Sequence, residues 1–227
     1  MVELLEKMGK SPDQVRVQDW NETEKVILTR RSVRLYKDKQ VPEELVKRIL
    51  EAGRFAPSAG NFQPWKFVVV RDPKILTFLE ESTIGACQKI VEMLGASKPS
   101  QPVHPFPASA TREIAKRNFG VLHGAPTAIL IFKDVRGLHS PDLDCGIAGQ
   151  NMVIAATSLG LGTCWVNFLH VAFAFVPEVK EFFDIEYPFE FLTSIVVGYP
   201  KGDPFGMVDR ETHAVEWYEN GSKHLAY

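Results

Sequence analysis

The sequence predicts an α+β fold in which one sheet packs against helices. Apolar stretches of strand length alternate along the chain with longer segments of helical periodicity. The 227 residues, 45% of them hydrophobic, suffice for one substantial core and are short for two ordinary domains. No repeat or low-complexity tract interrupts this order, so we predict a single domain over residues 1–227.

The first two helices have recognisable start signals. Asn21 followed by Glu24 has the form of a capping box, which predicts a helix that ends near Thr29. Pro42 occupies the place of a first helical residue, an apolar stripe follows, and Gly53 ends a second helix. Pro, Gly, Ser and Asn then crowd residues 55–65, which predicts irregular backbone.

The remaining elements follow in order from the same signals. Four prolines in residues 98–108 predict an exposed, mobile loop. We expect strands over residues 66–71, 127–132, 163–168 and 191–198. We expect helices over residues 73–94, 111–119, 142–159 and 177–183, and an irregular tail from Tyr199 onward.

The charge pattern argues against nucleic acid and membranes as partners. The formal net charge is -2, and no long basic run occurs. Residues 145–176 contain no Asp, Glu, Lys or Arg, but polar residues and the glycines at 160 and 162 interrupt them before the roughly 20 apolar residues that a spanning helix needs. We therefore predict a buried helix followed by a buried strand, and small molecules as partners.

The N-terminus and the cysteines suggest a reducing compartment. The first ten residues mix Glu and Lys among apolar residues and so lack the apolar stretch of a secretory signal. An odd number of cysteines without a C-x-x-C pair argues against a disulfide framework and a zinc site: Cys87, Cys145 and Cys164. We expect a cytoplasmic protein. A metal enzyme is a weak alternative, built on His139, Asp142 and Asp144.

A basic cluster follows the first predicted helix and comprises Arg30, Arg31, Ser32 and Arg34. If the segment is extended, Arg30, Ser32 and Arg34 point to one side. Guanidinium groups bind phosphate oxygens bidentately, and a hydroxyl group adds a further donor. A solvated basic turn is the alternative, because short charge clusters usually lie on the surface.

Two further segments could approach a ligand closely. Residues 56–65 combine amide and hydroxyl groups with aromatic residues and could lie against a planar heterocycle, although an ordinary connecting loop has the same composition. Residues 160–165, G-L-G-T-C-W, precede a strand instead of leading from a strand into a helix, which excludes a Rossmann turn. They form either a tight turn against a ligand or a helix C-cap.

Four motifs in this order resemble the nitroreductase family: R-R-S-V-R-L-Y at residues 30–36, A-P-S-A-G-N-F-Q-P-W-K-F at 56–67, Q-N-M-V-I-A-A-T-S-L-G-L-G-T-C-W at 150–165 and V-V-G-Y-P at 196–200. The resemblance implies a mostly antiparallel central sheet flanked by helices, and an FMN cofactor. It also implies a homodimer that exchanges C-terminal arms (about residues 199–227) and a lid over about residues 97–118.

The resemblance further implies roles for individual residues. Matching FMN-binding positions are Arg30, Arg31, Ser32, Arg34 and Arg210 around the phosphate and ribityl chain, Pro57, Ser58, Ala59 and Asn61 in a loop that reaches the partner subunit's flavin, and Cys164, Trp165 and Val166 near the flavin N5 edge. Phe106 and Phe119 are weaker candidates for contact with an aromatic acceptor. We assign no catalytic side chain and no metal, because the chemistry would occur on FMN N5.

The function that follows is an FMN-dependent oxidoreductase. It would transfer reducing equivalents from NADH or NADPH to a small acceptor such as a nitroaromatic or a quinone. The mechanism would be ping-pong, with donor and acceptor using the same pocket in turn. Two alternatives stay open: a flavin-fragmenting, benzimidazole-forming enzyme of the same superfamily, and a non-catalytic flavin-binding or sensor protein.

Overall fold

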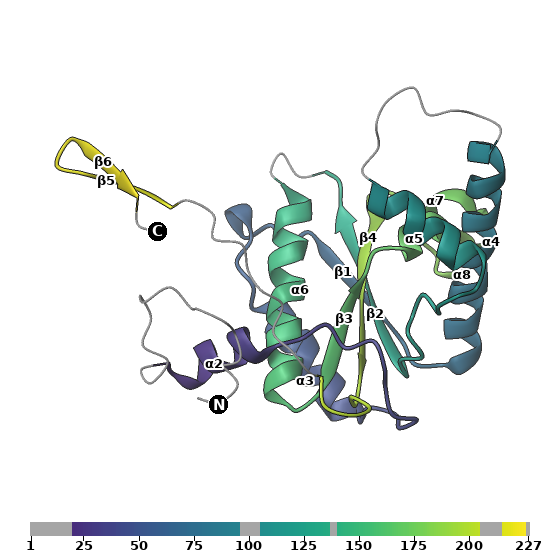
Figure 1. The fold of residues 1–227 in the computed structure, drawn as a ribbon, viewed down its shortest axis with the longest axis horizontal. Helices are drawn as coiled ribbons and strands as arrows, with labels where there is room; N and C mark the ends of the chain where they lie inside the picture. The colour runs from purple at the N-terminus through teal and green to yellow at the C-terminus, as the bar shows by residue number, and fades with distance from the viewer. Residues whose placement is uncertain (1–19, 96–104, 137–139, 205–214, 226–227) are drawn as a thin grey trace. The chain divides into compact units, whose positions relative to one another are not determined.

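The computed structural model describes residues 20–95, 105–136, 140–204 and 215–225. Helices and strands alternate along them (Figure 1). Their order is α2 (Glu22–Thr29), α3 (Glu43–Arg54), the 3-10 turn η2 (Ala59–Asn61), β1 (Trp65–Val70), α4 (Pro73–Gly95), α5 (Pro105–Ala115), β2 (Thr127–Asp134), α6 (Pro141–Ser158), β3 (Gly162–Val166), α7 (Leu169–Phe175), α8 (Pro177–Phe182), β4 (Phe189–Gly198), β5 (Glu216–Glu219) and β6 (Ser222–Leu225).

The central sheet has four strands in the order β1-β2-β4-β3, and every neighbouring pair is antiparallel. Trp65 of β1 pairs with Lys133 of β2 at one end of the sheet, and Gly162 of β3 pairs with Gly198 of β4 at the other. The predicted α+β class and the antiparallel sheet are therefore confirmed. β1 and β3 form the two edges of this sheet.

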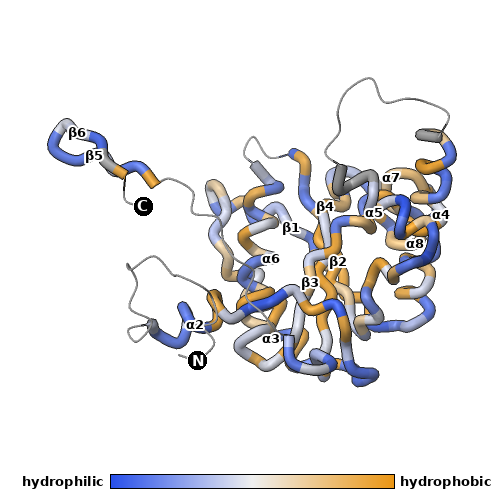
Figure 2. Tube along the Cα trace, viewed as in Figure 1, coloured by the Kyte–Doolittle hydropathy of each residue, from blue (hydrophilic) through white to orange (hydrophobic). Residues whose placement is uncertain are grey.

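Helices cover both faces of the sheet because its central strands are apolar on both sides (Figure 1). Ile129, Ile131 and Ile195 pack on one face with residues of α3 and α6. The alternate residues Leu130, Phe132 and Val196 pack on the other face with residues of α4, α5, α7 and α8. The hydropathy of the chain follows this arrangement, with apolar residues concentrated along β2 and β4 (Figure 2).

The chain divides into two units, one of residues 26–204 and one formed by the two chain ends outside this range. In the second unit, β5 and β6 pair as an antiparallel hairpin. Asn220 and Gly221 at its turn both have positive φ, 50° and 75°, which is the conformation that a two-residue hairpin turn requires. The predicted irregular tail is therefore wrong over these residues, whereas the exchange of this arm between subunits stays a prediction.

The capping signal at the first helix is confirmed. The side chain of Asn21 accepts hydrogen bonds from the backbone N–H groups of Thr23 and Glu24 at 2.9 and 3.1 Å. The Glu24 carboxylate accepts the N–H of Asn21 at 2.7 Å. Both partners of the capping box thus satisfy backbone donors that a helix start leaves unpaired.

Two predicted boundaries are wrong. The loop expected over residues 98–108 lies partly outside the described residues, but α5 begins at Pro105. Prolines are tolerated in a first helical turn, whose N–H groups have no partner within the helix. The helix expected over residues 111–119 already ends at Ala115, and Arg117 has a positive φ of 60°. No local signal predicted α7, which follows β3 almost directly.

The uncharged stretch of residues 145–176 divides between α6, β3 and α7. α6 buries Cys145, Met152 and Val153 against the sheet, so a buried helix followed by a buried strand is confirmed. None of the helices within the described ranges has the length and apolarity needed to cross a membrane.

Candidate functional site

The basic cluster lies along the outer edge of β3. Ser32 forms a parallel bridge with Thr163, and the backbone N–H of Val33 donates to the carbonyl oxygen of Thr163 at 2.8 Å. A Cβ atom added at Gly162 would come within 2.6 Å of the Val33 side chain. The second glycine of the G-L-G-T-C-W motif therefore makes room for this segment, while Gly160, at a φ of 74°, forms the turn after α6.

The arginines of the cluster differ in what they contact. Arg31 turns back on its own chain and donates from Nη1 to the carbonyl oxygens of Leu28 and Arg30 at 2.9 and 2.5 Å. Arg30 and Arg34 form no ion pair with any carboxylate in the described part of the chain. Val33 is buried and its neighbours Ser32 and Arg34 are exposed, as the extended alternation predicts.

Thr163 is a residue of this site that the sequence analysis did not single out. It is 2% exposed, and its hydroxyl oxygen has no hydrogen-bond partner among the described residues. As bridge partners in parallel strands, Thr163 and Ser32 project to the same side of the sheet. Buried polar groups normally have a partner, so a ligand with hydroxyl or phosphate groups at this edge would suit both side chains.

The residues that follow along β3 are held by packing. Burial raises the pKa of the Cys164 thiol, whose Sγ donates to the carbonyl oxygen of Trp165 at 3.5 Å, so Cys164 is a protonated packing residue. The ring of Trp165 packs on Gly149 of α6. Beyond the buried Val166, the side-chain oxygen of Asn167 accepts a hydrogen bond from the Thr193 hydroxyl.

The loop of residues 57–63, which contains the predicted flavin-contacting residues Pro57, Ser58, Ala59 and Asn61, lies between α3 and β1. The backbone N–H of Ala59 donates to the Asp144 carboxylate, with distances of 3.2 and 3.4 Å to its two oxygens. The Ser58 hydroxyl oxygen accepts the N–H of Gln63 at 2.9 Å. Gly60, Asn61 and Gln63 have positive φ values of 60°, 57° and 50°. Pro57, Gly60 and Asn61 are exposed, so much of the loop faces outward.

The loop and the basic cluster occupy diagonally opposite corners of the sheet. The loop leads into Trp65 at the start of the edge strand β1, whereas the basic cluster lies beside Thr163 at the start of the other edge strand. Three strand spacings of about 4.8 Å separate the two edges, or roughly 14 Å, and the length of β1 adds about 17 Å along the strands. The two predicted halves of the site therefore do not meet within one chain.

His123 is a second residue that the sequence analysis missed. It has a positive φ of 55° in the turn before β2 and is half-buried. Burial, and then the nearby positive charge of Arg34, lowers the pKa of its imidazole. The lowered pKa favours the neutral form of this imidazole. Glycines at 120 and 124 on either side were the only sequence signal of a special turn.

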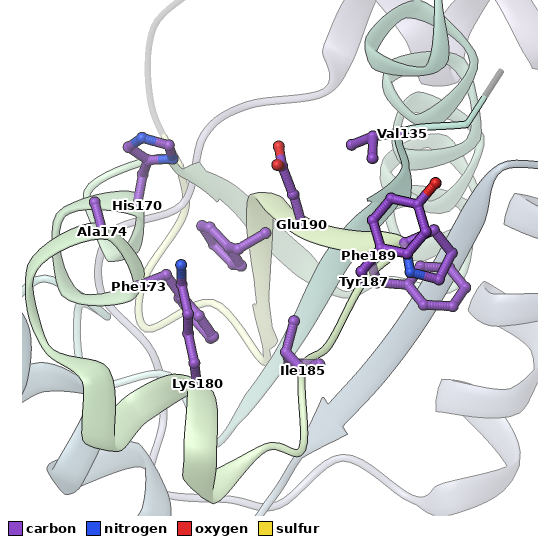
Figure 3. Close-up of a pocket in the computed structure, with 11 residues that line it drawn as sticks. Val135, His170, Phe173, Ala174, Lys180, Ile185, Tyr187, Phe189 and Glu190 are labelled. Atoms are coloured by element: carbon purple, nitrogen blue, oxygen red, sulfur yellow. The ribbon is translucent and has the colours of Figure 1, made fainter.

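Two hollows in the described part of the chain lie away from the basic cluster and the loop of residues 57–63. The larger, of about 400 Å³, lies between α7, α8 and the start of β4 and shares no residue with the predicted site. Its aromatic wall includes Phe173, and the amino group of Lys180 points into it (Figure 3). The smaller, of about 200 Å³, is lined in part by Phe119, which is 40% exposed. The Phe106 side chain and Arg210 lie outside the described residues.

The carboxylates of the suggested metal site have other partners. Asp142 forms an ion pair with Lys133 at 2.8 Å, and Asp144 accepts the Ala59 N–H. His139 lies outside the described residues. Within the ranges that the structure describes, no group of three His, Cys, Asp or Glu residues could hold a metal ion.

Comparison with known proteins identifies the family. The model of the Nitroreductase family matches residues 27–199. The chain belongs to the nitroreductase family. A Methanothermobacter thermautotrophicus protein with the provisional name NADH dehydrogenase/NAD(P)H nitroreductase is 34% identical over 181 residues, which cover 78% of this chain and 77% of that protein. The predicted family and the prediction of an oxidoreductase are confirmed.

Solved nitroreductase structures with bound FMN have the same fold. The one from Bacteroides fragilis has a TM-score of 0.72 and 27% identity, over 88% of this nitroreductase-family chain and 100% of its own. The one from Desulfitobacterium hafniense has a TM-score of 0.69 and 27% identity, over 86% and 98% of the two chains. The roles of the individual site residues stay predictions.

Proposed function

We propose that this nitroreductase-family protein binds FMN along the outer edge of β3 and transfers reducing equivalents from NADH or NADPH to a small acceptor such as a nitroaromatic or a quinone. The observation that carries the proposal is a pair of guanidinium groups at this edge, those of Arg30 and Arg34, which flank Ser32. Neither forms an ion pair with a carboxylate of the described residues. FMN in the two similar structures and the nucleotides in the relative's name support the choice of cofactor and donor.

The residues present fit FMN. A phosphate group carries a charge of about -1.5 to -2 and has three strong acceptor oxygens, which Arg30, Arg34 and the Ser32 hydroxyl would bind. The buried Thr163 hydroxyl would gain a partner from the hydroxylated ribityl chain. When bound, FMN supplies the acceptance and donation of hydride at its N5. The backbone from Cys164 to Val166 would hold the N5 edge of its ring.

We further propose that the protein acts as a homodimer in which each flavin meets the loop of residues 57–63 from the other subunit. A flavin along β3 would lie across the sheet from the loop of its own chain. The outward face of α6 supports association, because it is uncharged over four turns and includes Leu143, which is 62% exposed, with Ile147, Gln150, Ile154 and Ser158. The β5–β6 hairpin suits an exchanged arm, since a hairpin of two strands is marginally stable by itself and gains stability when it packs on other elements.

The proposal is tested by the visible spectrum of the purified protein after addition of FMN. We expect bound flavin bands that bleach when NADH or NADPH is added without oxygen and that return when a nitroaromatic or quinone follows. Initial rates with both substrates varied should give the parallel double-reciprocal lines of a ping-pong mechanism. Failure to retain FMN would refute the proposal.

The same preparation separates the two alternatives. A flavin-fragmenting enzyme would convert reduced FMN and oxygen to a benzimidazole, which chromatography of the aerobic reaction detects. A non-catalytic flavin-binding protein would bleach without steady-state turnover. A cytoplasmic location is part of the proposal and is consistent with three free, buried cysteines.

A further inference from the structure

We propose that Asp144 is a positioning residue for the flavin. By binding the backbone of Ala59, its carboxylate holds the loop of residues 57–63 in the shape that meets the flavin of the other subunit. This inference rests on the proposed function and adds to it a residue on a different element, 85 positions along the chain from the loop it holds.

The Asp144 carboxylate is buried, and its hydrogen-bond partner is the backbone N–H of Ala59. The residue is 6% exposed, and its carboxylate forms no ion pair with any cation in the described ranges. A buried carboxylate without a cation costs free energy. The Ala59 N–H and the N-terminal end of α6 offset that cost. An acid that served only the helix dipole would need no burial, as the exposed Asp142 in the same turn shows.

The loop needs such external support because of its backbone. Asn61 and Gln63 have φ values of 57° and 50°, a conformation that costs free energy for residues with a Cβ atom. The first turn of α6 contacts the loop on both sides of these residues. Asp144 accepts the Ala59 N–H, and the thiol of Cys145 approaches the carbonyl oxygen of Pro64 at 3.8 Å.

α6 connects the hydrogen bond between Ala59 and Asp144 to the proposed dimer. The helix carries the uncharged outward face and, at its N-terminal end, the residue that holds the loop. A loop fixed to α6 takes its position from the helix that would contact the second copy. Asp144 would therefore set where the loop lies relative to the flavin across the interface, without itself touching that flavin.

The experiment compares Asp144→Ala with Asp144→Asn, whose amide oxygen can still accept the Ala59 N–H. FMN dissociation constants come from quenching of FMN fluorescence, the flavin environment from visible circular dichroism, and subunit association from light scattering. We expect Asp144→Ala to raise the dissociation constant by about tenfold or more, to alter the flavin dichroism and to leave the dimer intact. Asp144→Asn should stay within about threefold of the wild type. The matched control, Asp142→Ala, should bind FMN as the wild type does.

A second variant reaches the same bond from the loop side and covers the case in which Asp144→Ala fails to fold. Ala59→Pro removes the N–H donor, and Ser58 already has the extended backbone that precedes proline, φ -143° and ψ 150°. Ala59→Pro should weaken FMN binding as Asp144→Ala does. The double variant should bind FMN no more weakly than whichever single variant has the lower affinity, because both substitutions remove the same hydrogen bond.

Three results would overturn the inference. Wild-type affinity and dichroism in both Asp144→Ala and Ala59→Pro would show that the bond does not position the loop. Fully additive losses in the double variant would show that the two residues act separately. Dissociation of Asp144→Ala into monomers would assign the residue to the interface instead. If the wild-type protein itself fails to bind FMN, the proposed function fails first and this inference with it.

Discussion

Gly149 of α6 allows β3 to pack closely against the helix. The substitution Gly149→Ala tests whether this contact has room for one more carbon atom. A Cβ atom at this position would lie 2.2 Å from Cη2 and 2.9 Å from Cζ2 of the Trp165 ring. Ordinary carbon contacts are about 3.5–4.0 Å, so the ring or the helix must move by on the order of 1 Å. An aromatic ring in a packed layer cannot bend away as a flexible side chain does.

The magnitude follows from two opposing contributions to the free energy of unfolding. Replacing a helical glycine by alanine stabilises a protein by about 0.4–1 kcal/mol where space allows. Overpacking by added carbon atoms costs about 1–3 kcal/mol. Gly149→Ala should therefore destabilise the protein by about 1–2 kcal/mol. Gly85→Ala in α4 is the matched control, since nothing lies within 4 Å of its added Cβ, and it should stabilise by about 0.5–1 kcal/mol.

Thermal and urea unfolding of the two variants, both loaded with FMN, measure this difference. For a chain of this size, 1 kcal/mol corresponds to about 2–4 °C in Tm. Gly149→Ala should melt below the wild type and Gly85→Ala slightly above it. Equal melting temperatures in the two variants would show that Trp165 yields without cost, which would refute the packing argument.

Other substitutions test the charges and thiols. Arg30→Ala and Arg34→Ala should each weaken FMN binding by about 1.5–3 kcal/mol, the range for charged hydrogen bonds, and unchanged affinity in both by fluorescence titration would refute the phosphate assignment. Burial and the charge of Arg34 lower the pKa of His123. The contribution of this residue to the free energy of unfolding is therefore fully present above the unfolded-state pKa of about 6.5 and declines as the pH falls below it. His123→Asn should flatten that decline in urea titrations, and an unaltered slope would contradict the assignment. Burial raises the pKa of Cys145 to about 12 and also raises those of the other two cysteines, so a thiol reagent at about pH 8 should label the native protein slowly. Rapid labelling of one site would count against this.

The elements that the sequence predicted well depend on short-range signals. The capping box of Asn21 and Glu24 satisfies donors within one turn, so its two residues suffice to locate a helix start. Prolines were misleading in residues 105–108, because a proline ends a helix in its interior and is accepted in its first turn. The β5–β6 hairpin was predictable in principle, since Asn220-Gly221 is a strong hairpin turn signal.

The site was predictable only where its residues are neighbours in sequence. The exposure of Ser32 and Arg34 around the buried Val33 follows from the alternation of an extended chain. The pairing of that segment with β3 does not, because no local pattern specifies which strand edge it joins. The hydrogen bond between Ala59 and Asp144 joins residues 85 positions apart and depends on how α6 packs beside the loop.

The outer edge of β3 affects how the protein would behave before FMN binds. The segment around Ser32 covers the start of the strand, and among the described residues no strand pairs with Trp165 or Val166 on that side. Strand edges with unpaired backbone groups are templates on which other chains can add, which is a route to aggregation. A flavin lying along this edge would screen it, so the cofactor would act as a folding partner as well as a reagent. Cells short of flavin would then yield less intact protein, and not merely inactive protein.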